Sequence, residues 1–238
     1  GGDFPAIADT STADIVATQF VFTALPTDAG ATNGDVVSGT AFKTQPVLQA
    51  QDADGQIDTH FTDTVSLTTD AGGVLSGTTS LQATGGVAAF TDVTYTATED
   101  GQSFALVAAD QAGGSGGDLP DANSGDRIAD IVATRIAFAT LPAHSGVVNS
   151  DVLSGIAFET QPLLQATDDN GQIDRDTAGS LTLEVSTGSV ALIGTNAVAW
   201  SGGQVDFAGS GLGVTTANDG SVFALGATSG DLTEATTG

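Results

Sequence analysis

The chain has 238 residues, of which 29 are Asp or Glu and only 4 are Lys or Arg, and its formal net charge at pH 7 is −25. Nucleic acids and anionic membrane surfaces are bound mainly through Lys and Arg, so this composition excludes both as partners. Hydrophobic residues make up 40% of the chain, which is enough to form a folded core despite the charge. The length allows two domains of ordinary size.

The sequence lacks Cys and Met, and it contains no visible signal peptide and no apolar run near the ~20 residues of a membrane span. We therefore expect no membrane insertion. The start at Gly1-Gly2 and the absence of Met indicate a processed product or a fragment. The acidic surface suits cation-rich surroundings, where screening relieves the repulsion between like charges.

A repeated hexamer organises the chain. Ala-Asp-Ile-Val-Ala-Thr occurs at 13–18 and again at 129–134, and each copy leads into an apolar run that ends in Leu-Pro. A repeat this literal indicates one module used twice. The copies also match at 38–46 and 154–162, and at 55–58 and 171–174, and an insertion falls at about 190–213.

Apolar residues alternate along most segments, as expected for β-strands with one buried face. Glycine-containing turns separate these segments, including Asp54-Gly55, Gly85-Gly86 and Asp219-Gly220. Many short strands at this spacing predict an all-β sandwich or barrel. The predicted strand faces are Phe20 with Phe22, Val65 with Leu67, Phe104 with Leu106 and Ala108, Ile136 with Phe138, Leu181 with Leu183 and Val185, and Phe223 with Leu225.

Four motifs carry a resemblance to a known family. They are Phe-x-Thr-Gln-Pro, an Asp-x-(Asp/Asn)-Gly turn, Gly-Gly-Val-Ala-Ala-Phe at 85–90, and Asp-Gly-Gln-Ser-Phe-Ala-Leu at 100–106. The chain resembles the bacterial immunoglobulin-like repeats of large exported surface proteins and adhesins. This resemblance implies an all-β fold of two tandem immunoglobulin-like β-sandwiches. It also implies a role as stalk, spacer or building block, although a fold does not by itself fix a function.

The resemblance also implies the domain boundaries, because in this family the last strand of one domain directly precedes the first strand of the next. We expect an N-terminal segment at 1–18, a first sandwich at 19–134 with its last strand at about 127–133, and a second sandwich at 135–238. By the same alignment, the segment at 12–17 matches a last strand, and the tail at 231–238 matches 118–125. The sequence thus predicts an extra N-terminal strand and a second sandwich that lacks its last strand.

A sandwich without an edge strand exposes backbone groups and core surface that favour strand addition. One interpretation is that the extra strand fills the second sandwich of a neighbouring copy, which gives a head-to-tail homopolymer. The alternatives are an arbitrary cut from a longer array and a domain that folds without that strand. One of Ile15 and Val16 must face the acceptor core, and the sequence does not decide which. The candidate polymerisation strand comprises Thr12, Ala13, Asp14, Ile15, Val16 and Ala17.

Two equivalent turns resemble part of a calcium loop with oxygen ligands at alternate positions. On EF-hand spacing, however, the first and twelfth ligand positions are Ala50 and Phe61 in one copy and Ala166 and Thr177 in the other. The alternative is a β-hairpin turn, in which Asp/Asn-Gly supplies a positive φ. The candidate calcium ligands are Asp52, Asp54, Asp58, Asp168, Asn170 and Asp174.

The run at 113–118 fits one copy of a calcium-binding nonapeptide, but that motif binds metal only in stacked copies, so a loop is the favoured interpretation. The acids Asp110, Asp118, Asp121 and Asp126 are a further candidate calcium group. We expect no other cofactor. Trp200 is either a core residue or a platform for a sugar or an intersubunit contact.

Catalysis has no visible machinery, and the sequence predicts that the chain is not an enzyme. His60 and His144 occupy non-equivalent positions and lack motif context. No nucleophile elbow or zinc-binding motif is present. We expect an extracellular structural protein of a prokaryotic cell surface, a fibre subunit assembled by donor-strand complementation. The alternative is a stalk fragment of a repeat adhesin, whose ligand would be a glycan or another cell surface, with calcium as a stabilising ion.

Overall fold

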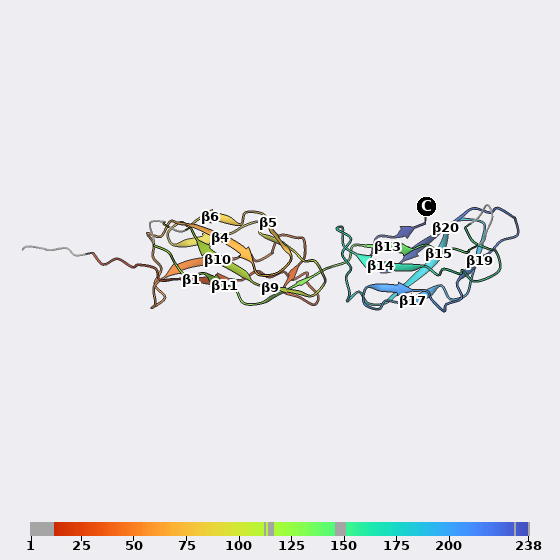
Figure 1. Cartoon of the computed structure of the whole chain (residues 1–238), viewed down its shortest axis with the longest axis horizontal. Helices are drawn as coiled ribbons and strands as arrows, with labels where there is room; N and C mark the ends of the chain where they lie inside the picture. Colours follow the sequence, from red (N-terminus) through yellow and green to blue (C-terminus); the bar gives the residue numbers. More distant parts are fainter. Residues whose placement is uncertain (1–11, 112, 114–116, 146–150, 231, 238) are drawn as a thin grey trace, which may run out of the picture. The chain divides into compact units, whose positions relative to one another are not determined.

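The computed structural model describes residues 12–111, 113, 117–145, 151–230 and 232–237. These residues form β-strands joined by turns and loops and no helix, so the all-β prediction is confirmed (Figure 1). Within the described ranges, nothing helical is long and apolar enough to cross a membrane. Residues 1–11 of the predicted N-terminal segment, Gly114 to Gly116 of the glycine-rich run, and Asp231 and Gly238 lie outside the described residues.

The first repeat contains the strands up to β12. They are β1 (Gln19–Ala24), β2 (Val36–Val37), β3 (Val47–Gln51), β4 (Thr64–Thr69), β5 (Val74–Ser76), β6 (Ser80–Gln82), β7 (Val87–Ala89), β8 (Thr94–Thr96), β9 (Gln102–Phe104), β10 (Leu106–Asp110), β11 (Ala122–Asn123) and β12 (Arg127–Asp130).

The second repeat contains the remaining strands. They are β13 (Arg135–Thr140), β14 (Leu163–Thr167), β15 (Ser180–Gly188), β16 (Ala191–Ile193), β17 (Ala197–Ala199), β18 (Gln204–Asp206), β19 (Gly213–Thr215), β20 (Phe223–Thr228) and β21 (Ala235–Thr236).

The two repeats share their sheet topology. The sheet β1-β3-β7 corresponds to β13-β14-β18, and β11-β10-β4-β6 corresponds to β21-β20-β15-β17. The short pair β5-β8 corresponds to β16-β19. The sheet β2-β12-β9 differs, because the described residues of the second repeat contain no counterpart of it.

Alternating burial explains why these segments are strands. Successive side chains of a strand point to opposite faces, and in β4 the inward positions Val65 and Leu67 are buried. Leu181 and Leu183 take the same inward places in β15. The predicted strand faces are therefore confirmed in both copies, with Phe22, Phe138, Val185 and Phe223 only partly buried.

Two glycines allow the hairpin before β7 and its counterpart before β18 to approach a neighbouring turn closely. Gly86 and Gly203 have φ values of 79° and 72°, which L side chains rarely adopt. A Cβ would lie 2.4 Å from the carbonyl oxygen of Asp58 at Gly86, and 2.2 Å from that of Asp174 at Gly203. Glycine at these two positions thus lets the hairpins pack against the turns at 52–58 and 168–174.

The chain divides into two compact units, which do not coincide with the sequence repeats. The first unit contains the described residues within 1–27, 41–94 and 104–126, and the second contains those within 28–40, 95–103 and 127–238. Thus β2, β12 and the loop that leads into β9 belong to the second unit. The boundaries predicted from the repeats at 19–134 and 135–238 remain predictions.

Each unit has its own hydrophobic core. In the first unit, Phe20 and Phe61 make an edge-to-face contact with ring centroids 5.5 Å apart. In the second unit, a buried cluster includes Leu164, Leu183, Phe207 and Trp200. The side chain of Trp200 is 8% exposed, and its Nε1 donates a hydrogen bond to Ser229 Oγ at 2.7 Å. The core interpretation of Trp200 is therefore confirmed.

The predicted N-terminal strand at 12–17 is not formed in the single chain. Among the described residues, this segment pairs with no strand. The one backbone amide of the segment that donates a hydrogen bond there is Ala17 N, at its end. A strand needs backbone hydrogen bonds to a neighbouring strand, and here no such neighbour is present. The segment, red in Figure 1, extends away from the body of the first unit.

Candidate functional site

In the first repeat, β12 fills a place between β2 and β9. It runs parallel to β2, with Ala129 opposite Val36. Ser38 N donates to Asp130 O at 2.8 Å, and Gly101 N donates to Ala129 O at 3.0 Å. The side chains of Ala129 and Ile131 are completely buried. The second copy of the hexamer therefore begins as a core strand.

The equivalent place in the second repeat is an open groove. Residues 152–154 correspond to β2 and its next residue, and residues 221–223 correspond to β9. Between them lies a cavity of about 340 Å³. Leu153, one of its lining residues, is 43% exposed. The lining residues are Val152, Leu153, Ser154, Val190, Val214, Thr216, Ala217, Asn218, Asp219, Gly220, Ser221 and Phe223.

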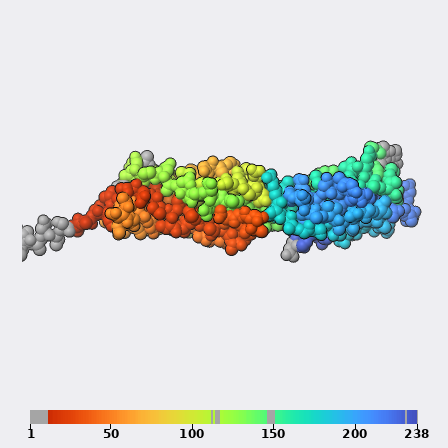
Figure 2. Space-filling model, turned by 90° about the horizontal axis from the view of Figure 1, so that it is seen from below, coloured from red at the N-terminus to blue at the C-terminus, as the bar shows by residue number. Residues whose placement is uncertain are grey.

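The first copy of the hexamer is anchored at its end and exposed before that. Ala17 N donates to Asp58 Oδ2 at 3.1 Å, just as Ala133 N donates to Asp174 Oδ2 at 2.9 Å in the second copy. Ile15 and Val16 are 37% and 59% exposed. Figure 2 shows this segment in red, projecting from the body of its unit. The two hexamers thus contact equivalent turns at their ends, but only the second begins within a formed strand, β12.

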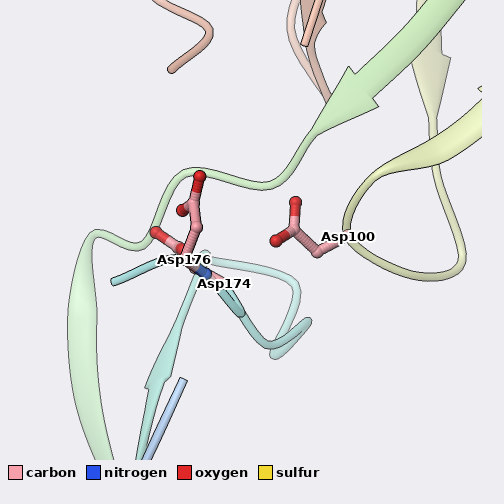
Figure 3. A group of neighbouring side chains, drawn as sticks. All are labelled: Asp100, Asp174 and Asp176. Atoms are coloured by element: carbon pink, nitrogen blue, oxygen red, sulfur yellow. The ribbon is translucent and has the colours of Figure 1, made fainter. Parts of the chain in front are cut away.

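A group of three carboxylates lies at the turn after β14. One oxygen each of Asp100, Asp174 and Asp176 lies within 4.8 Å of the others. Figure 3 shows Asp174 and Asp176 side by side, with Asp100 directed toward them from the loop that leads into β9. All three residues belong to the second unit.

Backbone amides hold these carboxylates in place. Asp100 Oδ1 accepts a hydrogen bond from Ile131 N and its Oδ2 accepts one from Arg175 N, each at 2.9 Å. Asp174 Oδ1 accepts a hydrogen bond from Asp176 N at 3.1 Å. The oxygens therefore converge because backbone amides of the connection after β12 and of the turn after β14 donate hydrogen bonds to the same carboxylates.

Asp130, at the end of β12, is a fourth carboxylate near this group. Its side chain is 1% exposed, and its Oδ2 accepts a hydrogen bond from Thr32 N at 2.5 Å. Its Oδ1 is buried and has no hydrogen-bond partner among the described residues. Burial raises the pKa of Asp130, the backbone amides of Thr32 and Asn33 partly oppose this shift, and the negative charges of Asp100 and Asp174 add to it.

Asp176 shows the strongest effect of this crowding. A hydrogen bond shared with the Asp174 side chain raises the pKa of Asp176 to about 7, with contributions from burial and from the charges of Asp174, Asp130 and Asp100. Without a cation, the group thus keeps a proton that an isolated carboxyl would have lost near pH 4.

Replacing Asp176 with Asn is expected to raise thermal stability in the presence of a chelator, and more so at pH 8 than at pH 4. A carboxyl whose pKa is raised on folding stabilises the fold below its unfolded pKa, and that stability is lost as the pH rises through about 7. Asn keeps the shape and removes this loss. Melting curves at both pH values measure the difference, with Asp54→Asn on an exposed turn as the control. An equal shift at both pH values would contradict the expectation.

The turn residues predicted as calcium ligands hold their own turns. Asp52 Oδ1 accepts hydrogen bonds from Asp54 N and Gln56 N, and Asp168 Oδ1 accepts the equivalent bonds from Asn170 N and Gln172 N. These bonds fit the hairpin-turn interpretation. Of the six predicted ligands, only Asp174 belongs to the carboxylate group. Calcium binding at the turns themselves remains a prediction.

The remaining candidates are spread over separate loops. His60 Nδ1 lies 3.2 Å from Asp14 Oδ1. His144 contacts backbone groups, with its Nε2 at 2.9 Å from Ala157 O and its Nδ1 accepting from Leu153 N at 3.2 Å. Asp110 Oδ2 accepts a hydrogen bond from Leu119 N, and Asp118 Oδ1 accepts one from Gly113 N. Within the described ranges, Asp110, Asp118, Asp121 and Asp126 do not join a group of three ligand atoms.

Sequence reasoning missed Asp100, Asp130 and Asp176. For Asp130 a clue was present, because it is the one charged residue in the otherwise uncharged repeated hexamer. For Asp176 the clue was a difference between the repeats, since His60 occupies the equivalent position in the first repeat. For Asp100 there was none beyond its place before a turn glycine.

No model of a known protein family matches the chain, and no curated protein matches it. Among solved structures, it is similar to a β-glycosidase from Bacteroides vulgatus, at 13% identity and a TM-score of 0.34 over 92% of this chain and 24% of that one. A β-glucuronidase from Parabacteroides merdae with glycerol in its active site shows 14% identity and a TM-score of 0.29, over 90% of this chain and 24% of that one. The chain thus spans about a quarter of the length of these enzymes, and TM-scores this low establish no shared fold.

Proposed function

We propose that the chain is a non-enzymatic structural subunit of an extracellular fibre, built from two tandem immunoglobulin-like sandwiches. In this proposal, the segment at 12–17 of one copy enters the groove at 152–154 and 221–223 of the next. The observation that carries it is the match between this exposed hexamer and the buried strand that fills the equivalent groove of the first repeat.

The register of β12 supports a specific docked arrangement. Ala129 lies opposite Val36 and Asp130 opposite Val37. Transferred to the groove, Ala13 lies opposite Val152 and Asp14 opposite Leu153 of the neighbouring copy. Ile15 then takes the place of the completely buried Ile131. Main-chain hydrogen bonds give such strand addition its strength, and the alternate side chains give its specificity.

The contact is heterologous, because donor and groove are different surfaces of the same chain. Heterologous contacts that do not close into a ring build open filaments. The net charge of −25 favours surroundings rich in cations, where repulsion between neighbouring copies is screened. These features support a location at a prokaryotic cell surface.

Deleting residues 1–17 is the experiment that tests this function. We expect the 238-residue chain to form filaments in electron micrographs and the shortened chain to remain monomeric, since its groove is intact but its donor is gone. Circular dichroism of both chains checks that the β fold is retained. Monodisperse monomers in both samples would contradict the proposal and favour a stalk or spacer module.

A further inference from the structure

We propose that Asp100, Asp130, Asp174 and Asp176 form a binding site for one divalent cation, with calcium as the preferred ion. The proposal is independent of fibre assembly, because the four residues belong to the same unit of a single chain. They come from three segments: the loop before β9, the end of β12 and the turn after β14.

The first observation is the convergence of oxygens. Asp100, Asp174 and Asp176 each offer one carboxylate oxygen within 4.8 Å of the others. Ligand oxygens around a bound calcium ion lie 2.3–2.6 Å from it, so they lie up to about 5 Å apart across the ion. The three oxygens are therefore spaced as the ligands of one ion.

The second and independent observation is the orphaned oxygen of Asp130. This side chain is 1% exposed, yet its Oδ1 has no hydrogen-bond partner in the described part of the chain. The segment that follows it contacts the group, because Ile131 N donates to Asp100 Oδ1 and Ala133 N donates to Asp174 Oδ2, each at 2.9 Å. An unpaired carboxylate oxygen is costly to bury unless a positive charge compensates it.

The neighbouring basic side chain does not supply that charge. Arg175 lies between Asp174 and Asp176 in sequence, but its Nη1 pairs with Glu99 at 3.3 Å, and it is its backbone N that donates to Asp100. The adjacent guanidinium is thus directed to Glu99 and not to the group, whose one side-chain donor among the described residues is the Asn33 amide at Asp176 Oδ2. A bound cation would satisfy all four.

The donor chemistry selects the kind of ion. Every ligand is a carboxylate oxygen, which suits hard cations, and neither sulfur nor imidazole belongs to the group. Calcium accepts irregular geometry from ligands on loops, whereas magnesium requires near-ideal octahedral geometry and gives up its waters reluctantly. Since Asp100 and Asp176 lie on loops, the site favours calcium. Binding would cross-link the three segments and stabilise the unit by mass action.

The first repeat provides an internal comparison. The counterparts of Asp130, Asp174 and Asp176 are Asp14, Asp58 and His60. His60 contacts Asp14, and both are exposed. In the described residues, these three do not bring their ligand atoms together as the second copy does. The site is therefore expected once per chain, in the second unit.

Equilibrium dialysis of the full chain against calcium tests the site, because it counts bound ions whether or not the chains assemble. At physiological ionic strength with magnesium present, we expect one saturable calcium ion per chain above the diffuse binding of an acidic surface. Asp130→Asn should weaken this binding about tenfold or more. The control variant Asp206→Asn, at an exposed position of the same unit, should leave it unchanged.

Melting temperatures with and without calcium are a second measurement, and they distinguish a cation ligand at Asp130 from a residue with a purely structural role. With chelator, Asp130→Asn should melt at or above the wild-type temperature, because it removes a buried charge. With calcium, the order should reverse, because only the wild-type chain gains stability from the ion. Absence of a saturable site, equal weakening by Asp206→Asn, or a lower melting temperature of Asp130→Asn by the same amount in both conditions would each overturn the proposal.

Discussion

Ile15→Asp is expected to abolish assembly of the chain, whereas Val16→Asp leaves assembly intact. The reason lies in the second hexamer, where Ile131 is completely buried and Val132 is only partly so. Burial of an Ile side chain contributes about 1.5–3 kcal/mol. A carboxylate at that depth also loses its hydration without a partner. Docking of the donor segment should therefore fail for Ile15→Asp.

Analytical ultracentrifugation and electron microscopy of both variants measure this difference. Ile15 is 37% exposed in the single chain, so its replacement should leave the β fold unchanged. The equivalent change Ile131→Asp serves as the contrast, because it should destabilise the chain itself. Filaments from both donor variants, or from neither, would show that the hexamer does not dock in the register of β12.

Appending residues 126–134 directly after Gly238 is expected to produce a stable monomer that no longer assembles. The tail at 231–238 aligns with 118–125, so the added residues would enter the groove as β12 enters the first. An intramolecular donor acts at a high effective concentration and outcompetes a neighbouring copy. The gain from burying the equivalents of Ala129 and Ile131 should raise the melting temperature by about 10 °C.

Differential scanning calorimetry and light scattering measure the two parts of this prediction. The matched control carries the same extension with its Ile131 equivalent replaced by Asp, which should neither raise the melting temperature nor stop assembly. If the unmodified extension left both properties unchanged, the cavity of about 340 Å³ would not be a strand acceptor. A rise in melting temperature without loss of assembly would mean that filaments use another surface.

Much of the fold could be predicted from local pattern. Alternation at Val65 and Leu67, or at Leu181 and Leu183, identifies strands because the pleat places every second side chain on the buried face. The turns at 52–55 and 168–171 follow from Asp/Asn-Gly chemistry. The strand at 12–17 is predicted from its alignment with the last strand of the first repeat, but it is not formed in the single chain, because a strand needs a partner and not only a suitable sequence.

The carboxylate group was not predictable in this way. Asp100, Asp130 and Asp174 are far apart in sequence, and in a chain with 29 acidic residues no spacing distinguishes them from solvent-exposed aspartates. Sequence reasoning placed Asp174 in a local calcium loop with Asp168 and Asn170. The structure directs Asp168 to the backbone of its own turn and groups Asp174 with Asp100 and Asp176.

The sequence by itself determined the all-β class, the repeat and the identity of the two hexamers, because these depend on periodicity and on direct comparison of residues. Only the tertiary structure decided that Ile131 rather than Val132 is the fully buried residue, that an open groove lies at 152–154 and 221–223, and that the carboxylates of Asp100, Asp174 and Asp176 lie together. Burial and the proximity of charged side chains depend on contacts between segments that are distant in sequence. The local sequence pattern does not indicate which distant segments come into contact.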